Sequence, residues 1–218
     1  ELTALAQSIY LVMYNRYNDV TGTELTTFID KTIDWVNQFT PELELEANWN
    51  YLRTNDNLIS TVYDTTVTSY DLPEEVRTVI YSPYRDATIS FDGAVVSTFS
   101  MVSPSNIADP TNPETQDRAT VINRKLVLSR PLTADEVGGE LRCDTINFMP
   151  TLSTTDTELL SLVQPKQLLI LGVAKNSTLP DIVQGGISPS IAQKYNDLLT
   201  KAVTANNETA AAMDAPRE

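Results

Sequence analysis

The spacing of hydrophobic residues changes twice along the chain, and this change restricts the fold more than any other feature. Residues 2–40 place apolar side chains at helical spacing, and residues 61–148 alternate with a period of two. Helical spacing returns from residue 165. Helices and strands are therefore segregated in the sequence, which favours an α+β fold over an alternating α/β fold.

We expect a helical bundle formed by the N- and C-terminal helices, with a central antiparallel β block between them. The expected parts are an N-terminal helical hairpin, a β-rich insertion, C-terminal helices that complete the helical unit, and an extended C-terminal tail. They cover residues 1–60, 61–150, 151–205 and 206–218.

Short motifs place the ends of several expected elements. Residues 21–24 form a capping box for the second helix, which we expect to end near residues 40–41 because proline removes a backbone donor. The acidic segment 42–46 fits either a short edge strand or a loop. Asp92-Gly93 predicts a tight β-hairpin, and Asn123-Arg124 lies between two further strands.

The residue types present argue against an enzyme. The chain has no histidine and one cysteine, Cys143, which lies in an alternating segment and is expected to be buried or half-buried. The acidic pairs Glu74-Glu75 and Asp135-Glu136 fit no catalytic spacing and are interpreted as solvated turns. The sequence also contains no phosphate-binding glycine motif, so we expect no catalytic residue, cofactor or metal.

The formal charge of −14 argues against a binding groove for duplex DNA, which requires Lys and Arg. No apolar run approaches the roughly 18 residues of a membrane span, and we expect no secretory leader. Aromatic residues lie beside arginine at residues 14–17 and 81–85, where we expect a core edge or a subunit contact. Trp35 and Trp49 are expected to anchor the core or an interface.

Residues 188–205 predict an amphipathic helix with an apolar stripe. The stripe contains Ile191, Tyr195, Leu198 and Leu199. The following residues, 205–218, have little apolar surface to offset the cost of ordering a backbone, roughly 1–2 kcal/mol per residue. We therefore expect this tail to be disordered by itself and to become ordered against a partner.

The order of elements resembles a known family. The resemblance rests on the initial helical hairpin, on three short strand motifs, and on the helices that begin near Pro165 and Ser188. The strand motifs are Tyr70-Asp71-Leu72-Pro73, Val76-Arg77-Thr78-Val79 and Leu126-Val127-Leu128-Ser129-Arg130-Pro131. Together these features resemble the head-to-tail adaptor proteins of tailed bacteriophages, also called connector or neck proteins.

The resemblance implies a structural virion protein without enzymatic activity. Such a protein is made in the host cytoplasm and forms a ring of about twelve copies between capsid and tail. The ring would dock on the portal protein, contact tail or tail-completion proteins, and let DNA pass through its lumen without specific binding. The C-terminal segment would bind the portal through Ile191, Tyr195, Leu198, Leu199, Met213 and Arg217.

Two other function classes remain open from the sequence. One is another virion structural protein, such as a tail-completion or decoration protein. The other is a hydrolase that uses a pair of carboxylates, which two clustered acidic side chains in a pocket would favour.

Overall fold

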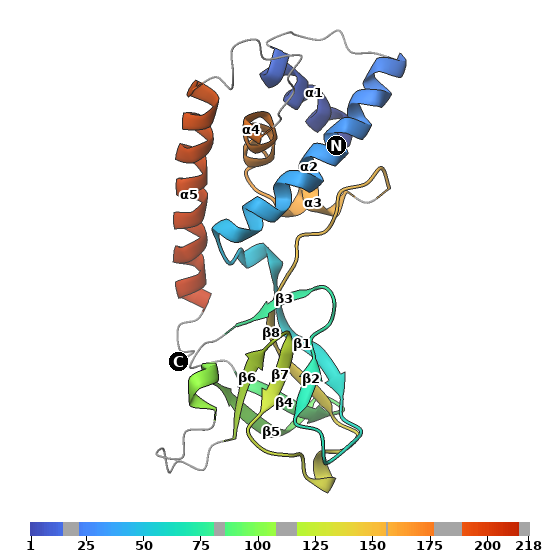
Figure 1. Ribbon diagram of the computed structural model, residues 1–218, viewed down its shortest axis with the longest axis vertical. Helices are drawn as coiled ribbons and strands as arrows, with labels where there is room; N and C mark the ends of the chain where they lie inside the picture. Colours follow the sequence, from blue (N-terminus) through green and yellow to red (C-terminus); the bar gives the residue numbers. More distant parts are fainter. Residues whose placement is uncertain (15–21, 81–85, 108–116, 156, 177–188, 214–218) are drawn as a thin grey trace. The chain divides into compact units, whose positions relative to one another are not determined.

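The computed structural model of the chain (Figure 1) describes residues 1–14, 22–80, 86–107, 117–155, 157–176 and 189–213. It divides into two compact units. Unit 1 combines Glu1–Tyr51 with Met149–Ala210, and unit 2 contains Leu52–Phe148.

Unit 1 is helical. Helices α1, α2 and α4 pack against one another around buried leucine, isoleucine, valine and phenylalanine side chains. The helices of the described residues are α1 Leu2–Tyr14, α2 Gly22–Glu46, α3 Glu158–Leu162, α4 Gln167–Asn176 and α5 Pro189–Met213.

Helix α2 continues through Pro41 to Glu46, so the expected end near residues 40–41 is wrong, and residues 42–46 are neither strand nor loop. A proline at this position leaves the carbonyl of Asn37 without its usual amide donor. The hydroxyl of Thr40 donates to that carbonyl instead, at 3.4 Å. Leu43 is fully buried, and the indole of Trp49 donates to its carbonyl at 2.7 Å. Burial and side-chain hydrogen bonds therefore extend the helix past the proline.

Unit 2 consists of one curled sheet of eight strands (Figure 1). The strand order is β1-β8-β4-β5-β6-β7-β2, and β3 also pairs with β8. The apolar side chains of these strands form one buried cluster. The strands are β1 Arg53–Thr61, β2 Ser69–Asp71, β3 Val76–Val79, β4 Asp86–Phe91, β5 Ala94–Met101, β6 Arg118–Ile122, β7 Lys125–Leu128 and β8 Glu140–Asn147.

Both predicted turns are confirmed. Asp92 and Gly93 have φ values of 48° and 82° and join β4 to β5. Asn123 and Arg124 have φ values of 50° and 61° and join β6 to β7. Positive φ at both central residues matches the right-handed twist of the flanking strands. Arg124 tolerates this conformation while its guanidinium donates to two backbone carbonyls at 3.0 and 3.1 Å.

The predicted fold class is wrong. The sheet is mixed, because β5 and β6 run parallel, with Ser100 opposite Arg118 and Met101 opposite Ala119. A parallel pair requires a long crossover, and the connection between β5 and β6 is long enough to supply it. The helices are also not arranged as an N- and C-terminal bundle around an antiparallel block, since the sheet curls on itself and forms its own core. Periodicity identifies strands, but it does not specify their direction of pairing.

Candidate functional site

Helix α5, red in Figure 1, carries five of the six residues that the sequence assigns to partner binding. Its apolar residues recur at helical spacing along one side, and the opposite side is exposed and polar. Two groups of contacts within unit 1 hold this helix.

The first contact is made by Tyr195, which is 3% exposed. Its ring meets the ring of Phe39 in α2 edge to face, with centroids 5.9 Å apart. The ammonium group of Lys175 in α4 lies 4.6 Å from the centre of the same ring. Burial, with help from nearby Glu46 and Glu42, raises the pKa of Tyr195 to about 12. Tyr195 is therefore a neutral anchor inside its own unit rather than an exposed contact residue.

The second contact is a set of amide hydrogen bonds at Asn206. Its Oδ1 accepts the backbone N–H of Asn50 at 2.8 Å, and its carbonyl accepts Asn50 Nδ2 at 2.7 Å. Its own Nδ2 donates to the carbonyl of Asn48 at 3.0 Å. These bonds fix the helix about three turns beyond Tyr195.

Between and beside these anchors the apolar side of α5 is only half-buried. We call this surface the α5 stripe, and it consists of Ile191, Leu198, Leu199, Ala202 and Val203. Tyr195 is the one buried side chain among those described on α5. The stripe keeps accessible apolar area that a partner can cover, so it is the candidate binding surface of unit 1.

The predicted partner-binding residues do not form one compact site. Ile191 and Met213 are separated by roughly 33 Å along the helix axis. Residues 206–213, which we expected to be an extended tail, continue α5 as helix. The side chain of Met213 and all of Arg217 lie outside the described residues, as does Ser188, near which we expected the last helix to begin. Leu198 and Leu199 are the predicted residues that lie together and remain accessible.

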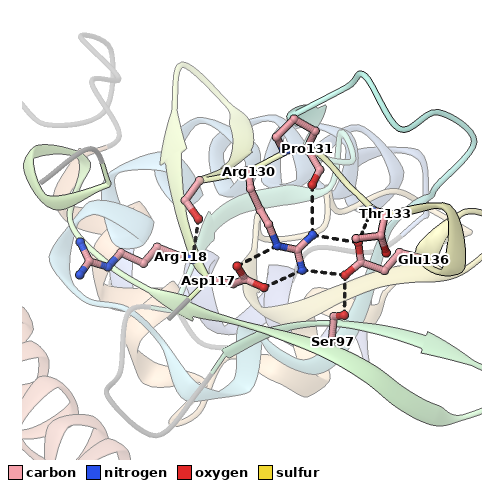
Figure 2. A network of polar contacts seen from close by, with 8 residues as sticks. Ser97, Asp117, Arg118, Arg130, Pro131, Thr133 and Glu136 are labelled. Carbon is pink, nitrogen blue, oxygen red and sulfur yellow. Dashed lines mark hydrogen bonds and ion pairs between the residues drawn. The ribbon is translucent and has the colours of Figure 1, made fainter. Parts of the chain in front are cut away.

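Unit 2 contains a cluster of polar side chains around Arg130 (Figure 2). Its guanidinium donates to both carboxylate oxygens of Asp117, at 2.8 and 2.6 Å, and to both of Glu136, at 2.9 and 2.8 Å. The carbonyl of Pro131 accepts a further bond at 3.0 Å, and the guanidinium carbon lies 4.9 Å from the ring centre of Phe99. Arg130 thus binds two carboxylates at once. We call this group, with Ser97, the Arg130 cluster.

Glu136 is the buried member of the cluster, at 3% exposure, which corrects the interpretation of Asp135-Glu136 as a solvated turn. It accepts Ser97 Oγ at 2.5 Å and the backbone N–H of Thr133 at 2.6 Å. The Arg130 hydrogen bonds, against the opposing effect of burial, lower the pKa of Glu136 to about 2. A charged carboxylate with every oxygen bonded is suited to stabilise the fold, not to transfer protons. Thr133 and Glu136 form a capping box, and this spacing in the sequence could have identified the buried glutamate.

The other residues that the sequence singled out lie in the core or on the surface. Cys143 is buried as expected, and burial raises the pKa of its thiol to about 12. Glu74 and Glu75 are exposed. Trp49 is buried and stacks on Tyr51, while Trp35 is half-buried against Phe28.

The aromatic–arginine group at residues 81–85 lies outside the described residues, as do residues 15–17 and the side chain of Tyr14. Within the described ranges, no group of three or more metal-binding side chains comes together. Among the described helices, none is long and apolar enough to cross a membrane.

Comparison with known proteins gives no family assignment. No protein-family model matches the chain, and no curated protein matches it.

Proposed function

We propose that this chain is a structural subunit of a bacteriophage particle, a head-to-tail adaptor that docks on the portal and connects it to the tail. The observation that carries the proposal is the α5 stripe, an apolar surface on a helix held at two points and half-covered by its own unit. Support also comes from the resemblance of the element order to adaptor proteins described above.

The stripe suits an assembly role because it combines a fixed position with uncovered apolar area. An amphipathic helix binds a groove through side chains at helical spacing, and the stripe offers this pattern. The Tyr195 and Asn206 contacts hold the helix before the partner arrives, which reduces the entropy lost on binding. In a ring of about twelve copies, each subunit would present one stripe to the portal.

The proposal can be tested with two variants that add the same charge on neighbouring residues. Leu199→Glu places a carboxylate in the α5 stripe, and Thr200→Glu places one on the exposed side of the same helix. We expect Leu199→Glu to weaken attachment to tail-less, portal-containing heads by about tenfold or more, because burying an unpaired carboxylate at a contact is costly. Thr200→Glu should attach like the wild type.

Attachment is measured by co-sedimentation of the purified protein with heads. Circular dichroism must show the same helix content for both variants. Equal attachment of both variants would mean that the α5 stripe does not contact the portal. A particle reconstruction that places this protein away from the portal–tail axis would contradict the adaptor role itself.

A further inference from the structure

Helix α5 is long, but it buries little of its own surface. It spans 25 residues, and Tyr195 is the one buried side chain among those described on it. Helix α4 spans ten residues of the same unit, and half of them are buried. They are Leu168, Leu169, Gly172, Val173 and Ala174. Buried apolar area supplies most of the free energy that holds a helix in a protein, so α5 is held less firmly than α4.

The composition of α5 leaves it dependent on its contacts. Its six alanines favour a helix, and its three threonines and three asparagines oppose one. The hydroxyls of Thr200, Thr204 and Thr209 each donate to the carbonyl four residues earlier, at 2.9 Å. Such bonds compete with the backbone amide for the same carbonyl and weaken a helix slightly. The packing of α5 against the rest of unit 1 therefore decides whether it stays in place.

The two groups of contacts that hold α5 lie about three turns apart on one stiff element. Tyr195 packs against α2 and α4, through Phe39 and Lys175, and Asn206 bonds to the segment that follows α2. The side chains between Tyr195 and Asn206 are half-buried or exposed. Because the helix between the two contacts is stiff, release of one of them displaces the other.

Water reaches the contact at Asn206. The hydrogen bond from its Nδ2 to the carbonyl of Asn48 is exposed, and the two bonds that it shares with Asn50 are partly buried. A hydrogen bond that water can replace contributes little net free energy. Few buried side chains and accessible hydrogen bonds are typical of a segment that opens locally while the remaining structure stays folded.

We infer that α5 is a strap that opens from unit 1 and closes on it as one piece, while α1, α2 and α4 stay folded. In the closed form, Tyr195 and Asn206 fix the α5 stripe in position. Opening withdraws the stripe from that position, so the motion switches the binding surface on and off.

This inference deepens the proposed function, because it rests on the α5 stripe as the binding surface. Its experiment uses the chain alone, without portal or heads. Failure of the strap and failure of portal docking are therefore separate results.

Hydrogen exchange of backbone amides in the free chain measures the opening of each helix. We expect the amides of residues 196–205 to be protected about tenfold or more weakly than those in the centre of α4. We also expect these α5 amides to share one opening free energy, because the helix leaves unit 1 as one piece.

Asn206→Ala and Thr204→Ala form a matched pair. The first removes both hydrogen bonds that the Asn206 side chain makes to the segment after α2, whereas the second removes a bond inside α5. Both introduce alanine, so both raise helix propensity. We expect Asn206→Ala to accelerate exchange by about tenfold throughout residues 196–205 and to leave α4 unchanged. Thr204→Ala should not accelerate exchange.

Tyr195→Ala and Tyr195→Phe test the other contact. Alanine removes the ring that meets Phe39 and Lys175, and phenylalanine keeps it. We expect Tyr195→Ala to accelerate exchange of the amides next to Asn206, three turns away, and Tyr195→Phe to leave them unchanged.

Circular dichroism must show that each variant is folded. Protection of the α5 amides equal to that of α4 in the wild type would overturn the inference. Acceleration confined to the turn around each substituted residue would overturn it as well, because the two ends of α5 would then open independently.

Discussion

At the scale of single residues, the Arg130 cluster shows how one buried carboxylate connects separate parts of a sheet. Glu136 accepts hydrogen bonds from three separate places in unit 2. The donors are Ser97 in β5, Arg130 in the segment after β7, and Thr133 in the turn before β8. The side chain of Glu136 is 4% exposed, whereas those of Arg130 and Asp117 are about one-third exposed. Because its donors are fixed, the ionised form is favoured over the neutral form.

This geometry predicts a pH-dependent contribution to stability. The pKa of Glu136 in the folded chain is about 2, below its usual value of 4.5. The stabilisation is therefore complete above the unfolded pKa and is lost as the pH falls toward 2. We expect Glu136→Gln to lower the free energy of unfolding by roughly 2 kcal/mol at pH 6, after allowance for solvent screening at the partly exposed Arg130.

The measurement is urea unfolding of the wild type and of Glu136→Gln at pH 6 and pH 3. The difference between them should shrink by more than half at pH 3. Glu74→Gln, which removes an exposed carboxylate, serves as control and should change stability little at either pH. A difference that does not change with pH would mean that Glu136 acts through packing alone.

At the scale of elements, the contact between α2 and α4 depends on one glycine. A Cβ added to Gly172 would lie 2.1 Å from the nearest ring carbon of Phe39. The ring cannot turn away easily, because Phe39 is 2% exposed and Tyr195 packs edge to face against it. Gly172 therefore lets three helices of unit 1 meet at one aromatic side chain.

We predict that Gly172→Ala destabilises the chain by roughly 1–3 kcal/mol through overpacking. The sign of this stability change is informative, because alanine in place of glycine inside a helix would otherwise stabilise the folded chain by about 1 kcal/mol. Gln167→Ala changes an exposed position of the same helix and should have little effect. Thermal unfolding measures both variants, and a Gly172→Ala chain at least as stable as the wild type would show that Phe39 can move.

At the scale of the whole molecule, unit 2 contains a complete sheet and its own core. Every residue of the buried cluster lies between Ile59 and Cys143. The two ends of the segment meet in the sheet, where Arg53 in β1 pairs with Ile146 in β8. A segment whose ends are adjacent can leave and re-enter another unit at little cost in chain entropy.

We therefore expect the fragment 52–148 to fold by itself. It should show a β-type circular dichroism spectrum and a cooperative thermal transition. The fragment 52–128 is the matched control, because it lacks β8, which pairs with β1, β3 and β4. The control should show no cooperative transition. If the fragment 52–148 also shows no cooperative transition, unit 2 requires unit 1 to fold.

The sequence by itself determined those features that depend on neighbouring residues. The turns at Asp92-Gly93 and Asn123-Arg124 were predictable because positive φ selects few residue types. The final strand and the apolar side of α5 followed from periodicity. Burial of Cys143 followed from its place in an alternating strand.

Tertiary structure decided the features that depend on distant residues. Helix α2 passes Pro41 because Leu43 is buried, and Glu136 is buried because Arg130 and Ser97 meet it there. The parallel pairing of β5 with β6 depends on where a long connection returns the chain to the sheet. Local patterns record the preference of each segment for helix, strand or turn, whereas these features follow from contacts between segments that the local pattern does not contain.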